Sequence, residues 1–210
     1  MYIIRLVFIP LLSVLLLSLA ACTTSSSQFY MLEPITGIEH KSPTGITQKP
    51  VIILSPVRIP HYVDRPQIVT ANGKNAYQLN ELNRWAEALD HNIGRVLAQN
   101  LTIMVPAEVG FSSTSTTAER ANFRVSVNIL EFHADPQGQA GLTAQWQITR
   151  SDGALVNRQV SYRAPASTSD YRIIVEALND CLNRLSRDLA DEVRRLADDK
   201  SAINKADRRF

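Results

Sequence analysis

Several residue types in this chain can do chemistry, but their spacing does not assemble a reactive site. The chain has no glycine-rich phosphate loop and no G-x-S-x-G nucleophile motif. His61, Asp64 and Arg65 come nearest to a reactive cluster, and an ion pair that fixes the turn before Pro66 is the better interpretation. The four histidines lack the paired spacing of metal ligands: His40, His61, His91 and His133. These residues predict no catalytic site, no metal site and no cofactor.

A different chemistry, acylation of a thiol, is indicated at Cys22. This cysteine directly follows Ala20 and Ala21, and an apolar run lies before them with Arg5 as the only charge. Small residues after such a run are typical of a secretory cleavage site. A cysteine at that point resembles a bacterial lipobox. The resemblance implies that residues 1–21 are a removed signal peptide and that lipidated Cys22 becomes the first mature residue.

Two other interpretations of the N-terminus are weaker. A transmembrane anchor needs roughly 20 apolar residues, and this run is shorter and contains Pro10. A plain signal peptide would leave the cysteine incidental. Residues 22–28 are polar and small, which is typical of a flexible tether. Thr23 stands where an Asp would indicate inner-membrane retention, so resemblance to that sorting rule favours the outer membrane, facing the periplasm.

Composition narrows the classes of function that remain for this chain. The 210 residues include 22 basic and 20 acidic side chains, which gives a formal net charge of +2. Such a balance, with signs alternating along the chain, argues against nucleic acid as a partner. The second cysteine, Cys181, lies at an apolar helical position and is expected to be a buried small hydrophobe. We therefore expect no internal disulfide in the mature domain.

The hydrophobic pattern predicts strands, a helix, strands and a second helix. Short apolar runs predict strands at 29–32 and 51–54, and Asn72-Gly73 marks a hairpin between 67–70 and 76–79. Alternation predicts three strands at 123–132, 142–149 and 155–162. Helical spacing predicts one helix from about Asn83 to Asn100, with Asn80 or Asn83 as its cap, and another from about Asp170 to Ala197, capped by Ser167 or Ser169.

This order lacks a regular βαβ alternation and predicts an α+β two-layer domain. In it, a mainly antiparallel sheet carries both helices on one face. We expect a single domain over residues 29–198 and a charged tail, residues 199–210, that frays.

Two segments resemble a known family. One is the string from Ser55 to Val69, which contains P-H-Y-V-D-R-P-Q-I-V, and the other runs from Leu82 to Leu101 and begins L-N-R-W-A-E-A-L. With the lipobox and the Phe29-Tyr30 start, they are similar to the ABC-type transport auxiliary lipoproteins of the PqiC type. Val63 stands where this family often has leucine. The match covers residues 22–101 in motif and continues to about Leu196 in layout.

The resemblance implies a non-enzymatic role in an envelope lipid transport system built around MCE proteins. The expected partners are an MCE-domain transporter subunit of the inner membrane, the outer-membrane lipid around acylated Cys22, and a further copy of the chain. The partner-binding residues that we expect are those of the first motif and the start of the second: Arg58, Tyr62, Asp64, Arg65 and Trp85. Trp85 also fits the apolar stripe of the first predicted helix and Tyr62 the edge of the core, where both would be internal.

Three alternatives remain open from the residues alone. A lipid-carrying domain would hold an acyl chain in an apolar pocket between sheet and helices, although a packed core would use the same residues. A periplasmic hydrolase would need a nucleophile motif that the sequence lacks. An assembly lipoprotein for other outer-membrane components would share the same anchor.

Overall fold

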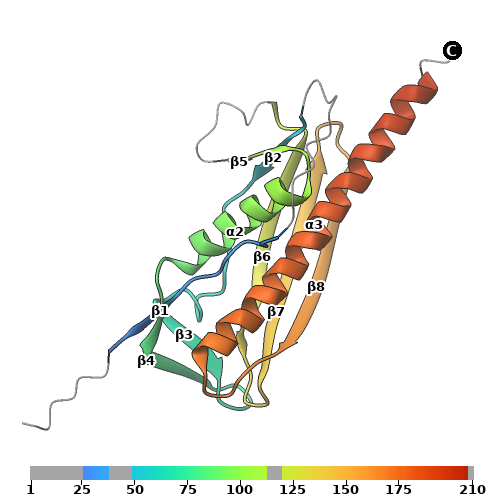
Figure 1. Cartoon of the computed structure of the whole chain (residues 1–210). Helices are drawn as coiled ribbons and strands as arrows, with labels where there is room; N and C mark the ends of the chain where they lie inside the picture. The colour runs from blue at the N-terminus through green and yellow to red at the C-terminus, as the bar shows by residue number, and fades with distance from the viewer. Residues whose placement is uncertain (1–25, 38–48, 113–119, 208–210) are drawn as a thin grey trace, which may run out of the picture.

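The computed structural model describes residues 26–37, 49–112 and 120–207, and it has two layers (Figure 1). Both helices lie on one face of a single sheet and pack against each other, which confirms the predicted α+β class. The predicted signal peptide, Cys22 and the start of the tether lie outside the described residues. The strands are β1 (Gln28–Tyr30), β2 (Val51–Leu54), β3 (Gln67–Ala71), β4 (Tyr77–Trp85), β5 (Glu108–Phe111), β6 (Phe123–Ala134), β7 (Gln139–Arg150) and β8 (Leu155–Pro165), and the helices are α2 (Leu89–Met104) and α3 (Tyr171–Asp207).

Strand β6 is the centre of the eight-stranded sheet. Along one edge it pairs antiparallel with β7, which pairs antiparallel with β8. Along its other edge it pairs in parallel with β2 and, at its far end, with β3. Strand β5 extends the sheet beyond β2, and β4 and then β1 extend it beyond β3. The long ladders are antiparallel, as predicted, and the parallel pairings are short.

The alternation of apolar and polar side chains in the central strands decides which side chains face the helices. Phe123, Val125, Val127 and Ile129 of β6 are buried under the helical layer, and the residues between them are more exposed. In α3, Leu182, Leu185 and Leu189 face the same core with no exposed surface. The helix continues to Asp207, past the predicted end at Ala197 and into the predicted tail.

The start of α3 differs slightly from the prediction. Ser167 accepts hydrogen bonds from the backbone N–H groups of Ser169 and Asp170, at 3.1 and 2.8 Å. The cap itself is Asp170, whose carboxylate accepts from the N–H of Arg172 at 2.9 Å. Ser167 therefore shapes the turn that leads into the helix, and the residue that caps the helix is Asp170.

The prediction that the first helix begins at Asn83 is wrong. Residues 77–85 form β4, which pairs with β3 on one side and β1 on the other. The backbone N–H of Trp85 donates to Pro66 O at 2.7 Å, which keeps that residue in the sheet. The helical spacing that begins at Trp85 is realised only from Leu89 onward, because tertiary pairing overrides local propensity. Asn80 and Asn83 are therefore not caps, and no side chain caps α2 at Ala88.

Three asparagines hold the segment after β1 against the helical layer. Asn92 of α2 accepts from the N–H of Leu32 at 2.7 Å and donates to its carbonyl at 3.1 Å. Asn100 of α2 accepts from the N–H of Ile35 at 2.8 Å, and Asn179 of α3 accepts from the N–H of Glu33 at 2.9 Å. The chain that leaves β1 is thus fixed to both helices.

Candidate functional site

The face of β6, β7 and β8 that points away from the helices carries two rows of polar side chains. We call this surface the open face. The register places Asn128, Gln145 and Gln159 side by side on the three strands. It places Ser126, Gln147 and Asn157 side by side in the next row. Gln145 donates to the side-chain carbonyl of Gln159 at 3.0 Å, so the amides are partly ordered by one another.

A groove of about 700 Å³ runs over these rows. One wall is the segment that follows β2, with Ser55, Pro56 and Arg58. The lining is completed by the six residues of the two rows together with Val127, Trp146 and Arg158. Amides and hydroxyls both donate and accept hydrogen bonds. The groove can therefore bind polar groups of a partner, and it offers little to an acyl chain.

Among the described residues, Arg58 is the unpaired cation of this groove, since the other arginine of the lining, Arg158, forms an ion pair with Glu192 of α3 at 3.5 Å. Its backbone is fixed, because its N–H donates to Val127 O at 3.1 Å and its carbonyl accepts from Ile129 N–H at 2.8 Å. Its side chain is exposed, and no ion pair to it is found among the described residues. A guanidinium on a fixed backbone at the rim of a polar groove is the type of group that anchors an interface.

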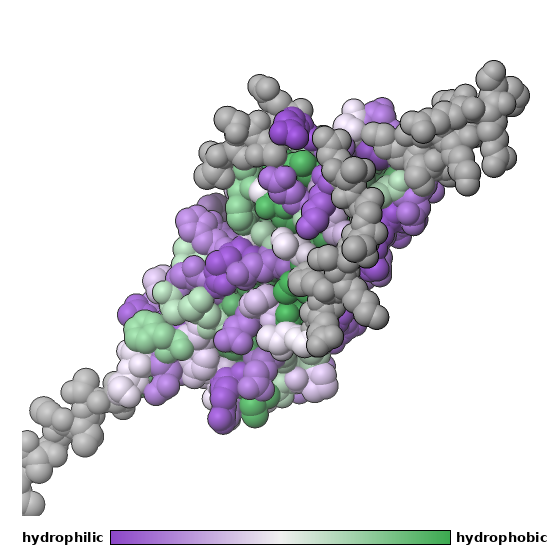
Figure 2. All heavy atoms as spheres, turned by 45° about the horizontal axis from the view of Figure 1, so that its top comes forward, coloured by the Kyte–Doolittle hydropathy of each residue, from purple (hydrophilic) through white to green (hydrophobic). Residues whose placement is uncertain are grey.

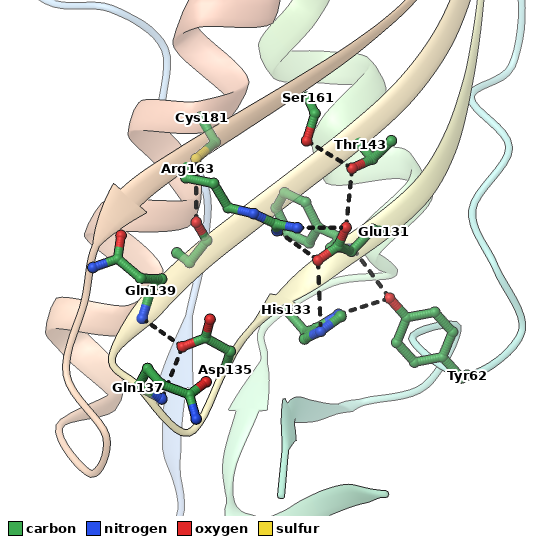
Figure 3. A network of polar contacts seen from close by, with 12 residues as sticks. Tyr62, Glu131, His133, Asp135, Gln137, Gln139, Thr143, Ser161, Arg163 and Cys181 are labelled. Carbon is green, nitrogen blue, oxygen red and sulfur yellow. Dashed lines mark hydrogen bonds and ion pairs between the residues drawn. The ribbon is translucent and has the colours of Figure 1, made fainter. Parts of the chain in front are cut away.

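Farther along the open face, Glu131 is the centre of a polar network (Figure 3). Arg163 of β8 donates to both of its carboxylate oxygens, at 2.5 and 3.1 Å, and Thr143 of β7 donates to it at 3.0 Å. Burial alone would raise the pKa of Glu131, but these hydrogen bonds outweigh it and hold the pKa below its usual value. Glu131 therefore carries its charge at neutral pH.

Gly141 makes the reach of Arg163 across β7 feasible. The register pairs Gly141 with Arg163 on one side and His133 on the other. A Cβ atom on Gly141 would lie 1.5 Å from Nη1 of Arg163 and 2.8 Å from Oε1 of Glu131. Only a residue without a side chain lets the guanidinium lie across the middle strand to the carboxylate.

The second half of the network joins the predicted residue Tyr62 to His133 of β6 (Figure 3). The Tyr62 hydroxyl accepts from the N–H of Phe132 at 3.2 Å and lies 2.9 Å from Nδ1 of His133. Nε2 of His133 faces the Glu131 carboxylate at 3.7 Å. A neutral histidine protonated on Nε2 satisfies both contacts, with the Tyr62 hydroxyl donating to Nδ1.

Burial sets the protonation of this pair. It lowers the pKa of His133, against the opposing effect of Glu131. It also raises the pKa of Tyr62 to about 12. The ring of Tyr77 lies 4.8 Å from the ring of Tyr62 and 5.3 Å from that of His133, and it covers both. Tyr62 thus ties the segment between β2 and β3 to the open face as a neutral hydrogen-bonding group.

We expect the free energy of unfolding to fall as the pH drops from about 7 to about 5. The pKa of His133 is lower in the folded protein than the roughly 6.5 of an unfolded chain, so the unfolded chain binds the proton more tightly. The contribution of neutral His133 is complete above about pH 6.5 and is lost as the pH falls through the folded-state pKa. Denaturant titrations at several pH values measure this. His133→Gln should reduce the pH dependence, and an unchanged dependence in that variant would contradict the assignment.

The structure separates the five predicted partner-binding residues. Arg58 and Tyr62 lie at the open face. Asp64 is exposed and Arg65 half-buried in the turn that follows Pro60. Trp85 is only 6% exposed, and its ring lies 6.3 Å from that of Phe132 in the core. Its burial contradicts the prediction that Trp85 offers its side chain to a partner.

The predicted ion pair before Pro66 is also absent from the described contacts of His61, Asp64 and Arg65. Backbone hydrogen bonds hold this turn instead. The N–H groups of Val63 and Asp64 donate to Pro60 O at 3.1 and 3.2 Å, and that of Arg65 donates to Val63 O at 2.8 Å. The carboxylate of Asp64 is therefore available at the surface, whereas Arg65 is half-buried and its Nε atom has no hydrogen-bond partner among the described residues.

Sequence reasoning missed the amide rows and the Glu131 network. Their signal is the polar half of each alternating strand, which indicates an exposed face but not which residues lie side by side on it. The long-range pair of Glu131 and Arg163 has no local signature, because it depends on strand register and on Gly141. No cluster of metal-ligating side chains occurs among the described residues. Within the same residues, no helix combines the length and apolar character needed to cross a membrane.

Comparison with known proteins identifies the class. Residues 30–190 match the model of the ABC-type transport auxiliary lipoprotein component family. The match covers most of the chain, including the open face, α2 and the first 20 residues of α3. The chain belongs to this family of transport auxiliary lipoproteins, whose description is that of an auxiliary transport component and not of an enzyme.

Individual relatives agree with this assignment. The chain is 22% identical to the intermembrane transport lipoprotein PqiC of Escherichia coli K12, over 89% of its own length and 97% of that protein, and equally to PqiC of Shigella flexneri. A crystal structure of a Xanthomonas campestris protein, 13% identical, superposes with a TM-score of 0.67 over 84% of this chain and 99% of that one. An uncharacterised protein, 18% identical, gives the same TM-score over 80% and 99%. These two structures support the fold.

Proposed function

We propose that this protein is an outer-membrane lipoprotein that faces the periplasm and serves as the auxiliary subunit of an MCE-type intermembrane lipid transport system. Acylated Cys22 holds the domain at the membrane, and the open face docks the periplasmic end of the MCE-domain transporter subunit. The family membership and the similarity to PqiC support the transport role. The observation that carries the docking role is the polar groove with Arg58 at its rim, on the face that the helices leave uncovered.

The anchor has a direct test. Cys22→Ala should abolish incorporation of labelled fatty acid and release the protein from the outer-membrane fraction. The reason is that each buried methylene contributes about 0.8 kcal/mol to membrane binding and a multiply acylated cysteine supplies many of them. Cys181→Ala is the matched control, since Cys181 is buried and should not affect labelling. Labelling that persists in Cys22→Ala would contradict the anchor.

Self-association is a second property of the proposed subunit, with no copy number fixed by the chain. A neutral surface at lipid-conducting machinery suits several copies around one transporter. Mass photometry of the acylated protein in detergent would measure the number of copies. A monomer at all concentrations would remove self-association from the proposal and leave docking intact.

The lipid-carrier alternative is less well supported. The groove on the open face is lined mainly by amides and hydroxyls, and the apolar side chains between sheet and helices are packed as a core. Native mass spectrometry of the purified lipoprotein distinguishes the two. A carrier should retain a lipid in addition to the acyl groups on Cys22, and a docking subunit should not.

A further inference from the structure

Three exposed apolar side chains lie where the N-terminal segment joins the sheet. Phe29 of β1 is 64% exposed, Met31 just after it 44%, and Leu82 of β4 42%. We call these three residues the anchor patch. The register that pairs Phe29 with Arg84 places Leu82 and Phe29 on the same side of the β1–β4 pair. In Figure 2, green apolar side chains lie at the surface near the lower left end of the coloured body.

The local backbone holds Leu82 outward. The register between β3 and β4 skips from Asn80 to Arg84, which leaves three residues in a bulge. Asn80 builds this bulge, because its side-chain oxygen accepts from the N–H groups of Leu82 and Asn83, at 2.9 and 3.1 Å. A bulge of this kind turns a side chain away from the sheet. The leucine on it is therefore presented to the surroundings and not to the core.

We propose that the anchor patch contacts the lipid surface into which Cys22 is inserted. This inference rests on the proposed acylation of Cys22. Phe29 follows Cys22 by seven residues, and a flexible segment of that length has a mean end-to-end distance of about 15 Å. The anchor thus keeps the patch close to the membrane, where the contact is effectively intramolecular. Three apolar side chains are too few to bind a membrane on their own. They are sufficient for a contact when the anchor already holds them near the membrane.

The charge beside the patch fits a phospholipid headgroup. Arg84 is the cross-strand partner of Phe29. Its one described ion pair, with Glu81, is long at 4.0 Å, and its side chain is 35% exposed. A partly exposed guanidinium next to an exposed aromatic ring matches the phosphate and the upper acyl region of a lipid leaflet.

Fluorescence of a tryptophan placed in the patch tests the contact. The full acylated protein carrying Phe29→Trp would be reconstituted in phosphatidylethanolamine–phosphatidylglycerol vesicles with and without acyl-chain bromines. Leu155→Trp is the matched control, because Leu155 is 54% exposed at the opposite end of the long strands. The native Trp85 and Trp146 are buried and supply a constant background, measured on the parent protein.

We expect brominated lipid to quench the tryptophan at position 29 at least about twofold more than the one at position 155. Equal quenching at the two positions, in protein whose intact mass shows the acyl groups, would overturn the anchor patch and leave the proposed function standing. An intact mass without acyl groups would overturn the proposed anchor itself, and the lipid contact with it. Protection of the patch by a second copy would give the first of these contrary results.

Discussion

Arg58→Glu is expected to reduce co-purification of the transporter subunit about tenfold or more, with no change in the circular-dichroism spectrum or melting temperature. The backbone of Arg58 is held by two hydrogen bonds to β6, which any residue except proline can make. Its side chain has no described partner within the chain, so reversal of the charge changes the rim of the groove and not the fold. Affinity purification from cells, with quantification of the transporter subunit, measures the effect.

Two further variants sharpen this experiment. Arg187→Glu makes the same charge change at an exposed arginine of α3, on the helical side of the molecule, and should leave recovery unchanged. Ser126→Trp fills the floor of the groove without a change of charge and should reduce recovery as Arg58→Glu does. Equal loss in the Arg187 variant would point to a general effect of charge, and unchanged recovery in both groove variants would exclude the groove as the docking site.

The double variant Asn92→Ala, Asn100→Ala is expected to lower the free energy of unfolding by about 3–5 kcal/mol. Asn92 is 1% exposed and Asn100 has no exposed surface. Their loss leaves both backbone groups of Leu32 and the N–H of Ile35 without their side-chain partners. Asn100 also donates to Asn183 and Ser186 of α3, at 3.0 and 2.9 Å, so the contact between the helices is weakened as well.

Urea denaturation followed by circular dichroism measures this loss. Asn157→Ala, an exposed asparagine of β8, is the control and should leave the midpoint unchanged. The double variant also has a functional meaning, since residues 32–35 connect the proposed membrane anchor to the domain. Its stability loss should appear together with faster proteolysis at the start of the domain. A double variant as stable as the parent protein would show that the asparagines do not hold this segment.

Much of the fold could be predicted because apolar residues recur along the strands and along α3 with regular spacing. The alternation in β6 and β7 and the leucine stripe of α3 each specify one buried face, so a two-layer α+β arrangement follows. The Asn72-Gly73 turn likewise places β3 beside β4, and the structure confirms the hairpin: Asn72 N–H donates to Ala76 O at 2.8 Å. These features depend on local sequence alone.

What could not be predicted depends on pairing between distant segments. The end of β4 at Trp85 has helical spacing with Leu89, and only its pairing with β1 and β3 keeps it in the sheet. Strand β5 is four residues long and, among the described strands, pairs with β2 alone, so its pattern is too short to predict a strand. Asp170 was passed over as a cap because Ser167 and Ser169 precede it with equally suitable side chains.

The candidate site was predicted in part for the same reason. Arg58 and Tyr62 were identified from the motif that carries them, and both lie at the open face. Their companions there, Gln145 and Glu131, come from other strands and are placed by register. The residue type of Trp85 fits both an interface and the core, and only its burial in the fold decides for the core. The chemistry of a residue can be inferred from the sequence, whereas its neighbours require the fold.

The most direct test of the docking role is site-specific photocrosslinking in cells. A photoreactive amino acid at Gln147, on the floor of the groove, would be compared with one at Arg187 on the helical side. Our account predicts that the residue at position 147, and not that at 187, crosslinks to the MCE-domain subunit of the same transport system, identified by mass spectrometry. Crosslinking to that subunit from position 187 alone, or from neither position in cells that assemble the transporter, would contradict it.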